Sequence, residues 1–297
     1  VEVAGRSVRI GPVIAEGGYS FVHVAYDMLE RRRTLALKRI VCHERDDVAR
    51  AIEEIELLKT LPLHPNIVRY RSSAQRKIAL PGGVIATEVL LLTDFYPGGG
   101  LQDVMNRLRE EGQVLSEQAL LLLFGQVCNA VAHLHSQSPP IAHRDVKLEN
   151  VLLHGEMDAS SPGRVRLVLC DFGSATTRAQ VYETRKDILE EEERIQKFTT
   201  LAYRAPEMVD LYQRKRIDER VDVWALGVLL YNMCFNKFPF DPQSPLSILS
   251  GRFSFPTGKG GDQMYSAALL DVISRCLLVD PDVRPSVFEV LDQVRKL

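Results

Sequence analysis

The sequence predicts an α+β fold in which a small β-rich lobe is followed by a larger helical lobe. Residues 8–92 consist mainly of short β-branched stretches of alternating polarity, and they contain one helical pattern at 46–61. A Pro-Gly-Gly-Gly run occupies 97–100, and long helical patterns follow it at 101–109 and 117–135. Because glycines permit a change of chain direction, this run favours a hinge between two lobes that share a cleft.

We expect one domain, with an N-lobe of residues 1–96, a C-lobe of residues 97–297 and a hinge at about 94–99. The chain has 297 residues, of which 45% are hydrophobic, so it can bury a substantial core. Residues 76–84 and 155–163 contain polar residues, Gly and Pro, and are predicted to be surface insertions.

The composition excludes several classes of function. The net charge is −2, so no global field favours nucleic acid or an anionic membrane surface. The five cysteines include no Cys-x-x-Cys pair, which argues against a disulfide framework and a zinc site and fits a reducing cytoplasm. We expect no signal peptide. The longest apolar run, 224–235, is shorter than the roughly 18 residues of a membrane span and is predicted to be a buried helix.

Three motifs occur in order in the second half of the chain. Residues 143–150 read His-Arg-Asp-Val-Lys-Leu-Glu-Asn, residues 170–173 read Cys-Asp-Phe-Gly, and residues 205–207 read Ala-Pro-Glu. Together with Lys38 upstream, they resemble the signature set of eukaryotic protein kinases, and the resemblance covers essentially the whole chain. It implies the bilobal protein kinase fold and transfer of the γ-phosphate of ATP to protein side chains.

The resemblance assigns catalytic roles to three residues. Asp145 is expected to accept or orient the proton of the substrate hydroxyl, and Lys147 to contact the γ-phosphate. Lys38 is expected to meet the α- and β-phosphates and to be fixed by a helix carboxylate. Counting back from the His-Pro-Asn-Ile-Val segment makes Glu54 that partner, with its neighbour Glu53 as the alternative.

The same resemblance predicts that ATP and Mg²⁺ are the cofactors. Asn150 and Asp171 are expected to bind Mg²⁺, because their side-chain oxygens are the hard ligands that this ion prefers. The glycine-rich loop at 15–22 keeps only one of the glycines of G-x-G-x-x-G, but its small residues still let backbone N–H groups approach phosphates. Thr93 falls at the gatekeeper position. The residues expected to bind ATP are Ala15, Gly17, Gly18, Ser20, Val22, Ala36, Lys38, Glu54, Thr93, Asp94, Tyr96 and Leu152.

Two residues indicate specificity for serine and threonine, again by resemblance. Lys147 is the residue that serine/threonine kinases place two positions after the base, and Thr200 matches the threonine that ties the substrate-binding loop to the base and the lysine. Asp222 is expected to hold the backbone of the catalytic loop. Arg284 is expected to form a buried salt bridge with Glu207.

Three segments, 15–22, 170–176 and 199–212, resemble the Numb-associated kinases, which include the adaptor-associated and cyclin-G-associated kinases. That resemblance implies phosphorylation of threonines in the medium chains of clathrin adaptor complexes. It implies a cytoplasmic protein, peripheral at clathrin-coated membranes, that acts in endocytosis or vesicle traffic. It also implies an extra helix after the Ala-Pro-Glu motif, beginning over 208–215.

The activation segment carries two further expectations. Arg144 precedes the base, which in many kinases means that a phosphate on this segment is bound to order the loop. Since members of the resembled family often order the segment without a phosphate, we expect basal activity. The charged stretch 186–197 is interpreted as a solvated helical insertion, with a dock for basic substrates as the alternative. The candidate phosphate acceptors are Thr176, Thr177, Thr184 and Thr199.

Three other functions compete with this hypothesis. A kinase-like scaffold is disfavoured because scaffolds commonly lack at least one of the four residues Lys38, Asp145, Asn150 and Asp171. A kinase of another pathway would make the subfamily segments coincidental, and a small-molecule phosphotransferase would not need the peptide-docking loop. We therefore expect ATP and protein substrates as partners, no nucleic acid, and a monomeric kinase domain.

Overall fold

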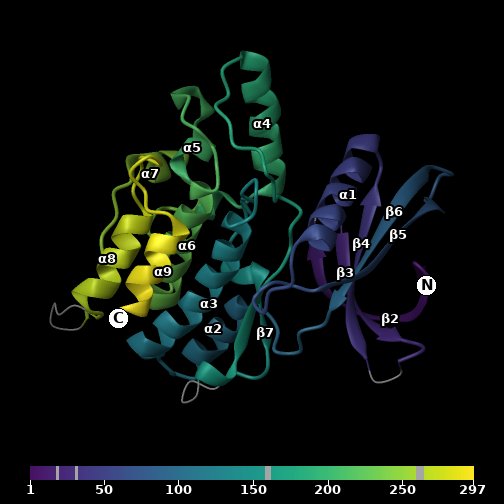
Figure 1. The fold of residues 1–297 in the computed structure, drawn as a ribbon, viewed down its shortest axis with the longest axis horizontal. Coiled ribbons are helices and arrows are strands. Elements are labelled where there is room, and N and C mark those ends of the chain that lie inside the picture. The colour runs from purple at the N-terminus through teal and green to yellow at the C-terminus, as the bar shows by residue number, and fades with distance from the viewer. Residues whose placement is uncertain (18–19, 31–32, 158–161, 259–263) are drawn as a thin grey trace. The chain divides into compact units, whose positions relative to one another are not determined.

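The computed structural model describes residues 1–17, 20–30, 33–157, 162–258 and 264–297. The described chain forms two compact units, each with its own core (Figure 1). The first comprises Val1–Leu63 and Ile67–Tyr96, and the second comprises His64–Asn66 and Pro97–Leu297. The first unit is β-rich and the second is mainly helical, which confirms the predicted α+β fold class.

The first unit contains one antiparallel sheet with the strand order β1-β2-β3-β4-β6-β5. Alternate residues of β4 and β6 point to one face, so that Leu35, Leu37, Leu90 and Leu92 form a fully buried core there. The strands are β1 (Glu2–Val3), β2 (Arg6–Gly17), β3 (Ser20–Asp27), β4 (Thr34–Cys42), β5 (Tyr70–Ala79) and β6 (Ile85–Asp94).

One long helix, α1 (Arg45–Thr60), packs against β4, β5 and β6 (Figure 1). Its buried residues are Ala51, Glu54, Ile55 and Leu58, which recur every three or four positions and therefore share one face. Glu54 is the only charged residue of that buried set. The periodicity of α1 thus turns one carboxylate toward the sheet.

The second unit is built around α6 (Arg220–Phe235), in which every residue from Val221 to Cys234 is buried. Around it, α3 (Glu117–His135) packs on α6, on α9 and on the short hairpin of β7 (Val151–His154) and β8 (Arg166–Leu169). In the described part of the chain, no helix combines the length and the apolar character needed to span a membrane. The other helices are α2 (Leu101–Glu110), α4 (Arg185–Phe198), α5 (Pro206–Val209), α7 (Pro245–Ser250), α8 (Ala267–Cys276) and α9 (Val287–Arg295).

One predicted insertion is partly strand. The segment 76–84 was expected to be a surface loop, but β5 runs to Ala79 because its polar residues have partners on β6. Arg76 pairs with the buried Glu88, and the Lys77 ammonium donates to the Thr87 hydroxyl at 2.8 Å. Only the residues between the two strands form the turn. In the second predicted insertion, 158–161 lie outside the described residues.

The prediction of an extra helix that begins over 208–215 is also wrong. Helix α5 ends at Val209, and a single 3₁₀ turn, Leu211–Gln213, follows it. The Asp210 side chain accepts a hydrogen bond from the Tyr212 N–H at 3.0 Å, so it caps a new turn instead of continuing the helix. Arg214 then adopts a left-handed φ of 52°, which ends that turn.

The long helix of this region is α4, which covers the charged stretch 186–197. It is not fully solvated as one interpretation required, since Ile188, Glu191 and Ile195 form a buried row along it. Thr184 caps its first turn by accepting a hydrogen bond from the Asp187 N–H. The stretch 186–197 is therefore helical and mostly exposed, as expected, but one face of it is buried in the second unit.

Candidate functional site

Lys38 lies in the middle of β4 and forms an ion pair with α1. Its ammonium donates to both carboxylate oxygens of Glu54, at 2.8 and 3.0 Å. The structure thereby selects Glu54 over Glu53, because Glu53 lies on the exposed face of α1. The side chain of Glu54 is 5% exposed and that of Lys38 is 18% exposed, so water screens this pair only weakly.

Strand register gathers the other predicted ATP-binding residues of the first unit. Residues directly opposite in an antiparallel pair lie on the same face, as do residues two apart along a strand. Val22 lies opposite Lys38, Ala36 lies opposite Thr93, and Ala15 lies opposite Val22. One face of the sheet therefore carries Ala15, Gly17, Ser20, Val22, Ala36, Lys38 and Thr93, while Gly18 lies outside the described residues.

Asp94 is the last residue of β6, and Tyr96 is the last residue of the first unit. The Asp94 carboxylate accepts two hydrogen bonds from the Arg71 guanidinium, at 2.6 and 2.7 Å, and its N–H donates to the Arg69 carbonyl. The side chain of Asp94 is therefore engaged within the first unit, and any contact with a nucleotide base falls to its backbone. Tyr96 is buried, with 8% of its surface exposed.

In the second unit, four hydrogen-bonding groups surround the Asp145 carboxylate. Oδ1 accepts from the Thr200 N–H at 3.1 Å and from the Thr200 hydroxyl at 2.8 Å. Oδ2 accepts from the Asn150 amide at 2.9 Å and lies 2.7 Å from the Lys147 ammonium. Lys147 also donates to the Thr200 hydroxyl at 2.8 Å. Both oxygens of Asp145 are thus held in fixed directions.

The two residues predicted to bind a metal both offer side-chain oxygen. The Asn150 amide nitrogen donates to the Asp145 carbonyl and carboxylate, so its oxygen is the atom left for a cation. The Cys170 N–H donates to the Asn150 carbonyl at 2.9 Å, which ties the segment of Asp171 to the catalytic loop. Asp171 itself adopts a left-handed φ of 60°. An amide oxygen and a carboxylate fit Mg²⁺, which takes its other ligands from water and phosphates.

A second carboxylate, that of Asp222 on α6, binds the backbone of the catalytic loop. Its two oxygens accept from the His143 N–H at 2.7 Å and from the Arg144 N–H at 2.8 Å, as the sequence predicts. The His135 ring contacts it at 2.9 Å. Burial alone would raise the pKa of Asp222, but the bonds from His135 and the backbone hold that pKa below its usual value.

The predicted salt bridge between Glu207 and Arg284 is also confirmed. The guanidinium donates to both carboxylate oxygens, at 2.7 and 2.9 Å, and both side chains are 0% exposed. Arg284 additionally lies over the Trp224 ring, 5.3 Å from its centroid. This pair fastens the Ala-Pro-Glu segment to the core of the second unit.

Leu152, the one predicted ATP-binding residue in the second unit, lies on β7. It pairs with Val168 on β8 and forms an isolated bridge with Gly100. It is half-buried, so part of its apolar side chain remains accessible at the edge of the hairpin.

Sequence reasoning missed one contact of the activation segment. Glu191 was treated as part of a solvated charged stretch, yet its carboxylate lies 2.7 Å from the Arg144 guanidinium. A signal was present, since Glu191 shares a helical face with Ile188 and Ile195. That apolar spacing separates it from the other glutamates of the stretch.

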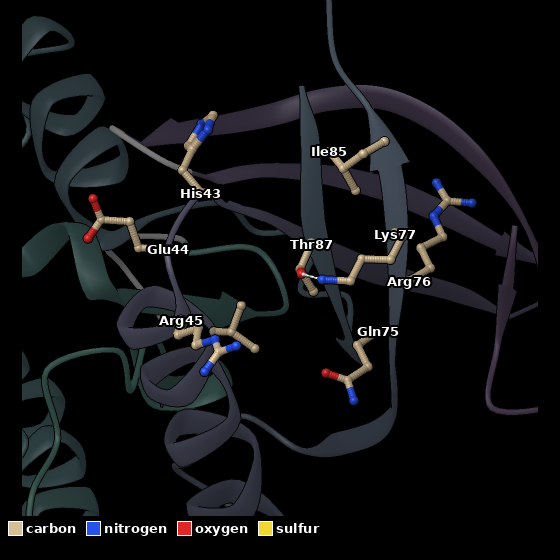
Figure 2. A pocket seen from close by; sticks show the side chains of 9 residues that line it. His43, Glu44, Arg45, Gln75, Arg76, Lys77, Ile85 and Thr87 are labelled. Atoms are coloured by element: carbon tan, nitrogen blue, oxygen red, sulfur yellow. Dashed lines mark hydrogen bonds between the residues drawn. The ribbon is translucent and has the colours of Figure 1, made fainter. Parts of the chain in front are cut away.

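A cavity of about 500 Å³ lies elsewhere in the first unit (Figure 2). It is bordered by the first turn of α1 and by β5 and β6, where the hydrogen bond between Lys77 and Thr87 crosses from strand to strand. No predicted site residue lines it, so the cavity contributes nothing to the assignments above.

Comparison with known proteins identifies the same kind of domain. The family described as "Protein kinase domain" matches residues 8–294. Two proteins of Dictyostelium discoideum named as probable serine/threonine-protein kinases are 39% and 35% identical, over 100% and 99% of this chain. A serine/threonine-protein kinase of Schizosaccharomyces pombe is 37% identical over 100% of the chain. The chain spans only 35%, 25% and 29% of the length of these relatives.

Proposed function

The chain belongs to the protein kinase domain family, and on that premise we propose that it transfers the γ-phosphate of ATP to serine and threonine side chains of proteins. One observation carries the proposal. The Asp145 carboxylate is fixed by Thr200 and Asn150, with the Lys147 ammonium 2.7 Å away. A base and a cation held together in this way provide two of the groups that phosphoryl transfer to a hydroxyl requires.

Each residue of the site has a distinct task in this proposal. Asp145 orients the substrate hydroxyl and accepts its proton, because its carboxylate is the buried acceptor of the catalytic loop. Lys147 neutralises charge on the transferring phosphoryl group. Lys38, fixed by Glu54, binds the α- and β-phosphates of ATP.

Asn150 and Asp171 are the residues that would bind Mg²⁺. When bound, this ion would neutralise negative charge on the phosphates of ATP. The chain's own contribution is the orientation of its ligands: the hydrogen bonds from the Asn150 amide nitrogen to Asp145 direct the Asn150 oxygen away from the base. Loss of that orientation would misplace the base and the metal ligand together.

Specificity for serine and threonine is supported by the hydroxyl of Thr200. It donates to Asp145 and accepts from Lys147, so it joins the substrate-binding loop to both catalytic groups. Two of the relatives are themselves named as serine/threonine-protein kinases, one of them as probable.

The test is the transfer of radioactive phosphate from ATP, with Mg²⁺, to a generic basic protein. We expect labelling of serine or threonine by the wild type, and its loss in Asp145→Asn and Asp171→Ala. Asp282→Asn, which changes an exposed aspartate, is the matched control and should label normally. ATP binding without any labelling by the wild type would instead support a kinase-like scaffold.

We further propose that the chain is a single kinase domain, residues 1–96 and 97–297, of the Numb-associated type. The support is the resemblance of the segments 15–22, 170–176 and 199–212. On this proposal the substrates are threonines in the medium chains of clathrin adaptors, and the protein is cytoplasmic, monomeric in its kinase domain, and peripheral at coated membranes in endocytosis.

A second assay separates this proposal from the first. A recombinant adaptor medium chain is offered beside the generic basic protein, and the labelled residue is identified by mass spectrometry. Labelling of one threonine in the medium chain, at the higher kcat/KM, is expected. Labelling of only the generic protein would retain the kinase and reject the adaptor substrate. Fluorescent fusion protein should also colocalise with clathrin at the membrane, and a diffuse distribution would contradict the proposed location.

A further inference from the structure

Arg144, the residue before the proposed base, has an unfavourable backbone that two carboxylates hold in place. Its φ is 66°, in the left-handed region that costs non-glycine residues about 1–2 kcal/mol. Its N–H donates to Asp222 at 2.8 Å, and its guanidinium lies 2.7 Å from Glu191. Strain of this kind persists only where the surroundings determine the conformation, and here they do so from both ends of the residue.

The ion pair between Arg144 and Glu191 is buried. The two side chains are 3% and 6% exposed. A buried guanidinium needs a counter-charge, because an unpaired charge in such a place costs several kcal/mol. The second unit supplies that charge from α4, whose buried row contains Glu191 between Ile188 and Ile195.

Tyr182 lies beside the ion pair between Arg144 and Glu191. It is 5% exposed, and its hydroxyl lies within hydrogen-bonding reach of both Arg144 and Glu191. Burial, and then the neighbouring Glu191 carboxylate, raise the pKa of the Tyr182 hydroxyl, so it stays protonated and can donate to that carboxylate. The three side chains form one small polar cluster that fastens the activation segment to the catalytic loop.

Three of the four threonines considered as phosphate acceptors serve the fold of the segment. The Thr184 hydroxyl caps α4, the Thr199 hydroxyl donates to Ile195 and accepts from Arg204, and the Thr176 hydroxyl accepts from the Arg178 N–H. The anion that pairs with Arg144 is therefore the carboxylate of Glu191, and none of these three threonines supplies it.

We propose that Glu191 is a positioning residue for phosphoryl transfer, with its carboxylate in the place that an activating phosphate would take on Arg144. The catalytic loop is then ordered without phosphorylation of the segment. This inference rests on the proposed kinase activity and explains the basal activity expected from the sequence. Glu191 acts through Arg144 on the neighbouring Asp145 and is not itself in contact with substrate.

The first experiment measures kcat and KM for ATP on a generic basic protein, with all proteins dephosphorylated and checked by intact mass. Wild type should remain active, and Glu191→Gln should lower kcat by about 10- to 100-fold, the effect expected of a small misplacement of the base. KM for ATP should change little. Glu193→Gln, which changes an exposed glutamate two positions along α4, is the matched control and should behave as wild type.

A rescue distinguishes the charge from simple packing. Glu191→Ser should be as impaired as Glu191→Gln, whereas the same variant with phosphoserine incorporated at that position should recover most of the lost kcat. Phosphoserine carries its anionic oxygens at about the reach of a glutamate carboxylate and can pair with an arginine. Failure of the phosphoserine to restore kcat would overturn the proposal. So would wild-type values in Glu191→Gln, or loss of wild-type activity on dephosphorylation.

A third measurement does not depend on activity. If wild type labels no protein, the proposed function fails. Hydrogen exchange still measures whether the ion pair between Arg144 and Glu191 orders the two segments. Glu191→Gln should speed amide exchange in 143–147 and 174–200, relative to Glu193→Gln. Equal exchange in the two variants would overturn the role of Glu191 in ordering these segments.

Discussion

The two units place their functional residues by different means. In the first unit, backbone pairing between β2, β3, β4 and β6 sets seven predicted ATP-binding residues on one face of a sheet. In the second unit, the catalytic loop at 143–150 has no strand partner among the described residues. Its position instead depends on the buried carboxylates of Asp222 and Glu191 and on the hydroxyl of Thr200.

The difference has an energetic consequence. A strand is held by many backbone hydrogen bonds, so the replacement of one side chain leaves the register unchanged. A loop held by a buried carboxylate loses several bonds at once, and each unsatisfied donor left behind costs about 1–3 kcal/mol. Single substitutions should therefore damage the second unit more than the first.

The largest effect is expected at Asp222. Asp222→Ala leaves the N–H groups of His143 and Arg144 and the ring of His135 without their acceptor. We expect the free energy of unfolding of the second unit to fall by about 3–5 kcal/mol, the range for breaking a buried charged contact. Urea denaturation monitored by the fluorescence of Trp224, which lies on the same helix, measures this change.

Its counterpart in the first unit is Asp94→Ala, which removes a carboxylate bonded to the Arg71 guanidinium. If both variants lost the same free energy of unfolding, the proposed difference between the two units would be wrong. That difference is that strand pairing places the residues of the first unit, whereas buried carboxylates place the catalytic loop of the second.

The second effect is on activity in the first unit. Glu54→Gln removes the charge that fixes Lys38, and we expect kcat/KM to fall by about tenfold, which corresponds to about 1.4 kcal/mol of transition-state stabilisation. The free energy of unfolding should also fall, by about 1–3 kcal/mol, because Glu54→Gln leaves the largely buried Lys38 ammonium without its counter-charge.

The control for that experiment is Glu53→Gln on the exposed face of α1, which should leave both quantities unchanged. Steady-state kinetics and thermal melting measure the two effects. An equal loss of activity in both variants would reject the assignment of Glu54 as the partner of Lys38.

The sequence predicted most of these placements, for reasons that differ between residues. The helix expected at 46–61 is observed at Arg45–Thr60, and the one expected at 117–135 is observed at Glu117–His135, because both are long runs rich in good helix formers such as Ala, Leu and Glu. Glu54 could be separated from Glu53 only by the face of α1 that each occupies.

The failures have a common physical cause, which is competition from local side-chain bonds and long-range contacts. The helix expected over 208–215 is interrupted because the Asp210 side chain caps a new turn. The four consecutive glutamates at 190–193 carry the same charge, so charge alone does not indicate which of them is buried. The spacing of Glu191 from Ile188 and Ile195 indicates the buried face, and the ion pair with Arg144, distant in sequence, supplies the counter-charge that this face needs.

A smaller effect is expected from pH. The pKa of Asp222 is lowered in the folded protein by its hydrogen bonds, although burial opposes this. The ionised carboxylate therefore contributes stability that is present above the unfolded pKa, about 4, and is lost as the pH falls through the folded value. We expect the difference in unfolding free energy between wild type and Asp222→Asn to be constant from pH 5 to 7 and to shrink below about pH 4. A difference that grew on acidification would contradict the lowered pKa.

The smallest effect is expected at Asp94, and it tests the first unit most directly. Its carboxylate is 27% exposed and pairs with Arg71, so Asp94→Asn should cost only about 0.2–1 kcal/mol of stability. Because the Asp94 side chain is engaged by Arg71, only backbone atoms remain for the edge of adenine, and KM for ATP should be unchanged. Arg71→Gln, which removes the other partner, is the matched variant and should give the same small loss. A marked rise in KM in Asp94→Asn alone would mean that the carboxylate itself binds the nucleotide, and that strand register does not suffice to place the ATP-binding residues of the first unit.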